Sequence, residues 1–276
     1  MFGKLIAVAA GCLVLQNAHA TLLFSDGFNY AAGGLNASDV TTSPYSGNAW
    51  SSGSSHITVA ANDLTYANMA DLGSNCVQDT WGVAAGSVYN TYTAQSGVGN
   101  SVYYSFLVQC TAAPAANTYL TSLNPGTSAP NGSSDALAVY VNTLGSGWEV
   151  GLRTDGASTV LASATPLTLN TTYLIVAEYT FGASGLGTAN LFIDPTAGAG
   201  QPTANVTANN TTSVTSIDDV GLKAQSSAGG FLLDNVLVGT TWADVTMATV
   251  VPEPSTLALA GLGLLGLAAR FRRARG

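Results

Sequence analysis

Short segments in which apolar and polar residues alternate recur along most of the chain. The clearest is TYLIVAEYTF at 172–181, where alternate residues fall on opposite faces of an extended strand. In GWEVGLRT at 147–154, apolar residues at 148, 150 and 152 alternate with Glu149, Gly151 and Arg153. Strand character also marks five further segments: Ser101–Cys110, Ala136–Leu144, Ala189–Pro195, Ser216–Ala224 and Gly230–Gly239. A period of two residues predicts β-strands throughout this part of the chain.

The residues between these segments favour turns rather than helices. Clusters of Gly, Pro, Asn, Ser and Asp separate the strands at short intervals, and no helical insert of 10–15 residues intervenes. Asp194–Thr215 is rich in the same residues and predicts an extended loop with one edge strand. The pattern predicts an all-β fold, a two-sheet antiparallel sandwich. No low-complexity linker divides the body, so we expect one domain over residues 21–248.

The first twenty residues have the three parts of a secretory signal peptide. Lys4 forms a basic region, Leu5–Leu15 is apolar, and Ala18-His19-Ala20 fits an A-x-A cleavage site. We therefore predict a signal peptide over residues 1–20, cleavage after Ala20, and export of the remaining chain.

Amino-acid composition and net charge narrow the classes of ligand that the protein can bind. Charged residues make up 8% of the chain, against roughly 25% in an average soluble protein. From Thr21 to Val251 there are two cations, Arg153 and Lys223, against fourteen carboxylates, which gives a formal charge of −12. Such a body repels nucleic acid and anionic lipid, and is compatible with divalent cations or neutral sugars.

Two cysteines remain in the body, Cys76 and Cys110. In an oxidising compartment they are candidates for a disulfide that closes a loop of 34 residues and contributes about 3 kcal/mol. One histidine, His56, accompanies them, and this set has no zinc-site spacing.

Three segments carry a resemblance to a known fold. LLFSDGFNYAAGGLN at 22–36, TYLIVAEYTF with ANLFIDP, and GFLLDNVLVGTTWADVT at 230–246 resemble concanavalin A/laminin G-like jelly-roll modules of bacterial surface proteins. The Asp-x-Phe-x-Tyr pattern at Asp26, Phe28 and Tyr30 would open the domain. The resemblance implies two curved sheets with a concave face, and a closing strand beside the first.

The resemblance also suggests a metal site and a ligand class. Related folds often hold calcium where the first and last strands meet, and Asp26 and Asp234 map to those strands. A structural calcium ion is therefore one hypothesis, and a simple turn or cap at Asp234 is the other. Concave faces of these folds often bind glycans. Trp50 and Trp81 lie in loop-like contexts and are candidates for stacking on sugars, whereas Trp148 and Trp242 are expected in the core.

Catalytic chemistry is not evident in the body. Laminarinase-like relatives carry an E-x-D-x-E motif on one strand, and this chain has no such motif. Its body contains two glutamates, Glu149 and Glu178, each alone on its strand, whereas glycoside hydrolysis generally needs a pair of carboxyl groups. We therefore predict a protein that is not an enzyme, with a glycan-active hydrolase using Glu149 and Glu178 as the alternative.

The C-terminal segment, 249–276, has three ordered parts. Pro252-Glu253-Pro254 comes first, an uncharged apolar run from Ser255 to Ala269 follows, and four arginines close the chain: Arg270, Arg272, Arg273 and Arg275. The run would form a transmembrane helix of about 22 Å, short of the roughly 30 Å hydrocarbon core. The positive-inside rule places the arginines in the cytoplasm.

These three parts resemble a PEP-CTERM sorting signal. In that family a membrane-embedded exosortase recognises the Pro-Glu-Pro motif and removes the tail. The resemblance implies an exosortase partner, transient inner-membrane anchoring and release to the cell surface or exterior. We predict a surface or extracellular-matrix protein, such as a biofilm matrix component, that binds exopolysaccharide. A purely structural matrix protein without a ligand is the remaining hypothesis.

Overall fold

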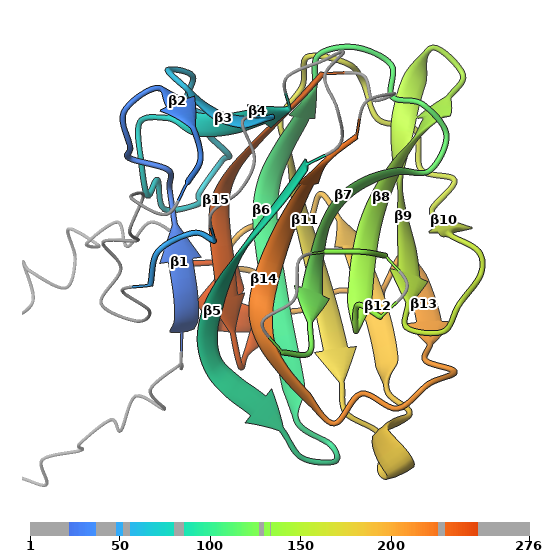
Figure 1. Ribbon diagram of the computed structural model, residues 1–276. Helices are drawn as coiled ribbons and strands as arrows, with labels where there is room; N and C mark the ends of the chain where they lie inside the picture. Colours follow the sequence, from blue (N-terminus) through green and yellow to red (C-terminus); the bar gives the residue numbers. More distant parts are fainter. Residues whose placement is uncertain are drawn as a thin grey trace, which may run out of the picture.

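The computed structural model describes residues 22–36, 48–51, 56–79, 86–126, 130–132, 134–225 and 230–247. Over these residues the chain forms two antiparallel β-sheets packed face to face (Figure 1). The predicted all-β sandwich is confirmed. The predicted signal peptide and the C-terminal tail lie outside the described residues, so their structures stay predictions.

One sheet has nine strands. Eight follow one another in hydrogen-bonded order, and β1 (Leu22–Asp26) pairs separately with β15. The order is β13 (Val206–Asn209), β12 (Thr188–Ile193), β11 (Tyr173–Thr180), β6 (Ser101–Cys110), β15 (Phe231–Gly239), β4 (Cys76–Asp79), β3 (Ile57–Ala60) and β2 (Gly33–Gly34). The first strand therefore lies beside the last, as the jelly-roll resemblance implies.

The other sheet has six strands, seen side by side in Figure 1. Their order is β10 (Leu161–Ala162), β9 (Gly147–Thr154), β8 (Leu137–Leu144), β7 (Thr118–Asn124), β14 (Ser216–Ala224) and β5 (Gly86–Ser96). Five of these strands are long enough to present several side chains on each face. We refer to the face turned away from the nine-stranded sheet as the outer face of the six-stranded sheet.

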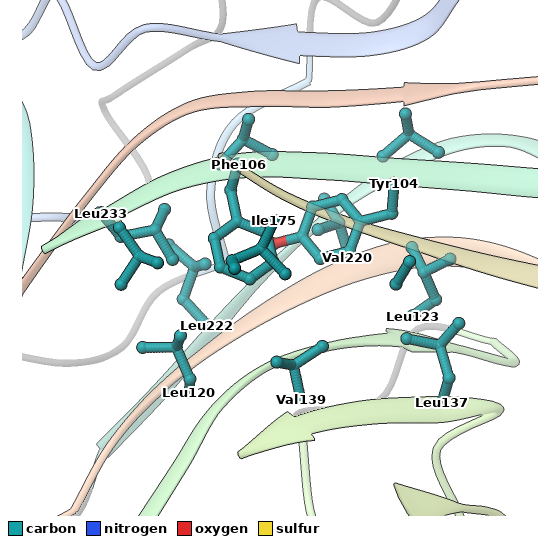
Figure 2. Close-up of a cluster of buried hydrophobic side chains, with 14 of the residues drawn as sticks. Tyr104, Phe106, Leu120, Leu123, Leu137, Val139, Ile175, Val220, Leu222 and Leu233 are labelled. Atoms are coloured by element: carbon teal, nitrogen blue, oxygen red, sulfur yellow. The ribbon is translucent and has the colours of Figure 1, made fainter. Parts of the chain in front are cut away.

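The core lies between the two sheets, because each strand directs alternate apolar residues inward. Figure 2 shows part of it. Side chains of the nine-stranded sheet (Tyr104, Phe106, Ile175, Leu233) lie against those of the six-stranded sheet (Leu120, Leu123, Leu137, Val139, Val220, Leu222). A hydrogen bond of 2.5 Å between the hydroxyls of Tyr104 and Thr121 joins the layers within this apolar core.

A second apolar cluster covers the opposite face of the nine-stranded sheet. A one-turn helix, α1 (Trp242–Val245), follows β15 and packs Trp242 against Phe192, with ring centroids 5.0 Å apart. The resemblance had placed these residues in the closing strand. That expectation is wrong beyond Gly239, because Thr241 and Asp244 form a capping box that starts a helix instead.

The predicted segments correspond closely to strands. Ser101–Cys110 and Ser216–Ala224 are β6 and β14, and the loop at Asp194–Thr215 contains the edge strand β13. A 3-10 turn at Ala183–Gly185 is the other short helical element within the described part of the chain. Among the described residues no helix is long and apolar enough to cross a membrane.

Candidate functional site

Four side chains form a row across neighbouring strands of the six-stranded sheet. Arg153 is on β9, Tyr140 on β8, Tyr119 on β7 and Lys223 on β14, in the order in which these strands pair. Their neighbours in sequence, such as Leu152, belong to the core. Because side chains alternate between the faces of a strand, the four lie on the outer face. We call this set the cation–tyrosine row.

The row is held together by its rings. Tyr119 and Tyr140 are stacked, with centroids 4.9 Å apart and planes inclined by 24°. The guanidinium carbon of Arg153 lies 5.1 Å from the Tyr140 ring centre, and Lys223 Nζ lies 5.3 Å from that of Tyr119. Cation–π attraction of this kind fixes both long cationic side chains over the stack. The rings are buried, so they position the cations rather than offer a free face to a ligand.

The loop before β8 packs against the row and holds the Tyr119 side chain in place. Asp135 is buried, and its carboxylate accepts hydrogen bonds from the Tyr119 hydroxyl at 2.5 Å and the Gly132 backbone N–H at 2.6 Å. Lys223 Nζ donates to the Pro130 carbonyl at 3.0 Å. Gly132 has a φ of +81°, and a Cβ there would lie 2.5 Å from Arg153 Nη2. Glycine is therefore required for the loop to approach the guanidinium so closely.

A pocket of about 450 Å³ opens over the row. This volume is typical of small-ligand sites. The residues around it are mainly polar and uncharged apart from the two cations: Asn117, Tyr119, Asn131, Tyr140, Arg153, Ser158, Thr159, Val160, Lys223 and Gln225. A larger hollow of about 620 Å³ lies at the β8–β9 turn and is lined by residues without an ionisable side chain, such as Gly145 and Pro166. The smaller pocket is the better candidate site.

Burial controls the ionisation of the groups in the pocket. Burial raises the pKa of Tyr140 to about 12, although the nearby Arg153 opposes the rise. Burial, and then the charge of Asp135, raises the pKa of Tyr119 well above its usual range. The pKa of Lys223 is lowered by burial, and the attraction of Asp135 partly offsets this. Both phenols therefore stay protonated at neutral pH, and the pocket is suited to recognising charge rather than to transferring protons.

Arg153 differs from Tyr119 and Lys223 because its guanidinium has no acceptor among the described residues. Its Nε is buried and unpaired in this part of the chain. A guanidinium offers five N–H donors in a planar fork that fits carboxylates and phosphates. The pocket therefore holds an oriented cation that is not neutralised by a neighbouring carboxylate.

Trp50 is not available for sugar stacking. It is fully buried, with its ring centroid 5.9 Å from those of Phe24 and Phe28, and its indole N–H donates to Asp26 at 2.7 Å. The expectation that Trp50 forms a binding platform is wrong, because a loop residue can fold back into the core. Trp81, the other candidate, lies outside the described residues.

Asp26 and Asp234 do not fit a shared calcium site. The Asp26 carboxylate already accepts from the Phe28 N–H at 2.7 Å and the Tyr30 hydroxyl at 2.6 Å, besides Trp50. Asp234 accepts from the N–H groups of Leu64 at 3.1 Å and Asn235 at 2.7 Å. Oxygens occupied by N–H and O–H donors are poor metal ligands. No cluster of three or more His, Cys, Asp or Glu suited to a metal occurs in the described ranges.

Cys76 and Cys110 do not pair. Both thiols are buried and free, and the two residues belong to different apolar clusters. They lie on β4 and β6, which flank β15 on opposite sides. Two strand spacings amount to about 9.6 Å, beyond the roughly 7 Å limit between Cα atoms of a disulfide. The predicted disulfide is therefore wrong.

The two glutamates proposed for the hydrolase alternative lie on opposite sides of the sandwich. Glu149 is on the outer face of the six-stranded sheet and accepts from the Ala164 N–H at 2.8 Å. Glu178 lies on the far face of the other sheet, where Ser101 Oγ and Asn190 Nδ2 each donate to it at 3.0 Å. The two sheets and the core between them separate the two carboxyl groups, so they cannot act as one catalytic pair.

The sequence showed part of the row but not the site. Arg153 and Lys223 stand out as the two cations of the body, and alternation places Arg153 on the polar face of its strand. Tyr119 and Tyr140 gave no comparable signal. The strand order that brings all four together is set by pairing between distant segments.

The C-terminal segment matches a family model. Residues 250–273 match the PEP-CTERM protein-sorting motif. This motif implies export and C-terminal processing by an exosortase. The matched residues include Pro252, Glu253, Pro254 and three of the four terminal arginines; Arg275 follows the match, and all of them lie outside the described part of the structure. No curated protein matches the chain in sequence.

Several solved structures are similar in fold at low sequence identity. The globular domain of T. cruzi calreticulin is 14% identical, covers 91% of this chain and 100% of its own, and has a TM-score of 0.49. The marine PL-14 alginate lyase from Aplysia kurodai is 10% identical, with coverages of 80% and 100% and a TM-score of 0.47. A carbohydrate esterase from Shiga toxin-encoding bacteriophage phi24B is 15% identical, with coverages of 79% and 100% and a TM-score of 0.43.

Proposed function

We propose that the mature protein is a non-catalytic component of the cell surface or extracellular matrix that binds exopolysaccharide. The binding site is the pocket over the cation–tyrosine row. The observation that carries the proposal is that both cations of a body with fourteen carboxylates meet in this one pocket. An arrangement that concentrates scarce charge and fixes it over stacked rings is typical of a recognition site.

The sorting signal is consistent with this role. The predicted signal peptide, residues 1–20, exports the chain, and the apolar segment Ser255–Ala269 holds it in the inner membrane with its arginines inside. Exosortase then removes the tail and releases the body to the side where exopolysaccharide accumulates. Neither step requires catalysis by the protein itself.

The polar rim of the pocket suits hydroxyl-rich ligands. Ser158 and Thr159 are exposed and offer hydroxyl groups. Gln225 accepts from the Tyr119 N–H through Oε1 at 2.7 Å, which leaves its amide nitrogen as the donor. Sugar recognition generally uses a few such donors and acceptors placed around a concave surface. A hydrolase is less well supported, because Glu149 and Glu178 lie on opposite faces of the sandwich.

A glycan array probed with the purified mature protein tests the proposal. We expect retention of at least one extracellular polysaccharide, and loss of this signal in the double variant Arg153→Gln, Lys223→Gln. The exposed Thr203 lies in the loop between β12 and β13, so Thr203→Asp serves as a remote control. Absence of binding to every glycan would leave the purely structural role and overturn the proposal. Release of shorter sugars from a bound glycan would instead indicate an enzyme.

A further inference from the structure

We infer that the pocket selects carboxylated sugars, so that its ligand is a uronate-containing polysaccharide rather than a neutral one. The inference rests on the proposed function, because it names the ligand class of the same pocket. It is carried by the state of the two cations: one has no acceptor among the described residues, the other lines the same pocket, and the buried carboxylate of Asp135 already accepts other hydrogen bonds.

Arg153 is the cation of the pocket without an acceptor among the described residues. Its side chain is half-buried and held over the Tyr140 ring, yet its guanidinium donates no hydrogen bond to another described residue. Leaving charged donors partly desolvated and unpaired is costly. Because Nε itself is buried, the Nη groups of the fork are the donors that a ligand in the pocket can reach, and a carboxylate that accepts two parallel N–H bonds from them would offset part of this cost. The hydroxyl of a neutral sugar matches neither the charge nor the bidentate geometry.

Asp135 does not neutralise the pair. Its oxygens accept from the Tyr119 hydroxyl and from the N–H groups of Gly132 and Asn131, the last at 3.4 Å. The carboxylate is buried at the Tyr119 hydroxyl, where it orders the loop and attracts Lys223. Two cations and one buried anion leave a net positive charge at the mouth of the pocket.

Lys223 and Arg153 also repel each other across the row. The charge of Arg153 is one of the causes that lower the pKa of Lys223, after burial. Like charges in one pocket raise the free energy of the unliganded protein, and a negative ligand between them would relieve this repulsion. Binding of a carboxylate should therefore favour the charged form of Lys223.

The negative charge of the whole body does not prevent this selection. At physiological ionic strength the screening length is about 8 Å. Carboxylates elsewhere on the surface, for example Asp63 and Asp71 in the loop between β3 and β4, are screened, whereas a ligand carboxylate inside the pocket would lie among the residues that include both cations. The overall charge instead disfavours polyanions that cannot enter the pocket.

Calorimetric titration of the wild-type mature protein tests the inference without any substitution. The ligands are a short oligouronate, the same oligomer after its carboxyl groups are reduced to alcohols, and a sulfated oligosaccharide of similar length. We expect the oligouronate to bind at least about tenfold more tightly than its reduced form, a factor that corresponds to about 1.4 kcal/mol. Equal binding of the two would overturn the inference and leave the proposed function intact. Tighter binding of the sulfated oligomer would overturn carboxylate selection, and no binding to any glycan would overturn both.

Variants of Arg153 separate geometry from charge. Arg153→Gln should weaken oligouronate binding about tenfold, and Arg153→Lys should restore part of it, because the charge returns without the planar fork. Thr203→Asp makes the same change in net charge on an exposed loop and should bind as the wild type does. Circular dichroism and melting of each variant verify folding. An Arg153→Gln variant that is folded and binds the oligouronate as tightly as the wild type would overturn the inference.

Discussion

The carboxyl group of Asp234 is fully buried in β15, and burial raises its pKa from 3.8 to about 8. Its two backbone donors, Leu64 and Asn235, oppose the rise without cancelling it. The folded protein therefore binds this proton more tightly than the unfolded chain does. By linkage, the stability that this proton provides is present below about pH 4 and is lost as the pH rises toward 8.

Substitution of Asp234 tests this dependence. We expect Asp234→Asn to be more stable than the wild type at pH 8.5, and to lose this advantage at pH 5, where the wild-type carboxyl is protonated. Urea unfolding at both pH values measures the difference. Burial also raises the pKa of Asp79, to about 6. Its contribution to the pH dependence of stability is the same in both proteins and therefore cancels from the comparison. An identical pH dependence in the two proteins would contradict the assignment.

The two thiols give a second prediction at this scale. Burial raises the pKa of Cys76 and of Cys110 to about 12, so both should be unreactive in the folded protein. We expect a thiol reagent to label neither in native buffer and to label both in urea, without any reductant. Reducing agent should leave the unfolding midpoint unchanged. A requirement for reductant before labelling would show that the cysteines are paired.

At the scale of the element, the one-turn helix α1 depends on its N-terminal cap. Thr241 Oγ1 accepts from the Asp244 N–H, and Asp244 accepts in return from the Thr241 N–H at 2.8 Å. Trp242 is fixed by this turn, and its indole donates to the Ala199 carbonyl at 2.8 Å. The cap therefore holds Trp242 in place against the second apolar cluster.

We expect Thr241→Ala to lower the free energy of unfolding by about 1 kcal/mol, the usual effect of losing an N-cap. Thr241→Ser keeps the hydroxyl and should stay within a few tenths of the wild type. Urea denaturation of the two variants measures the difference. Equal loss in both would mean that packing of the threonine methyl, rather than capping, stabilises the turn.

Alternation predicted seven of the fifteen described strands, and two long ones were missed for different reasons. β5 (Gly86–Ser96) is a polar edge strand, so it lacks a continuous apolar face. β7 (Thr118–Asn124) is buried along its whole length although it contains Thr, Ser and Asn. Some of its polar groups find partners on distant segments, as Thr121 does with the Gly221 carbonyl at 2.7 Å, whereas the Ser122 hydroxyl is buried without a partner in the described part of the chain. Such partners depend on the order of strands, which a local pattern does not contain.

The candidate site was less predictable than the fold for the same reason. The sequence predicts which face of its strand carries Arg153 and shows that cations are scarce in the body. Lys223, however, lies 70 residues later and joins the row only because β14 pairs with β7. The prediction for Trp50 was wrong because it depended on local context. The predicted disulfide was wrong because two cysteines in an oxidising compartment carry no information about the distance between them. Burial and strand order decided both cases.

At the scale of the whole molecule, the sorting signal predicts the mass of the exported protein. We expect the mature chain to lack both the first twenty residues and the terminal arginines, including Arg275, because signal peptidase and exosortase each remove one end. Intact-mass spectrometry of the extracellular protein measures this, with Glu253→Ala as the variant expected to retain its tail. Retention of Arg275 in the extracellular wild-type protein would contradict the processing step.

The central place of β15 has a consequence for secretion. This strand is the last one within the described ranges, yet it lies in the middle of the nine-stranded sheet and pairs with β1, β4 and β6. The sheet therefore cannot close while residues 231–239 are still inside the translocation channel. Until then the emerging chain must wait as an incomplete sandwich, and long-range pairing of this kind forms slowly. A chain truncated before residue 231 should remain unfolded outside the cell, which makes completion of synthesis a condition for a protease-resistant product.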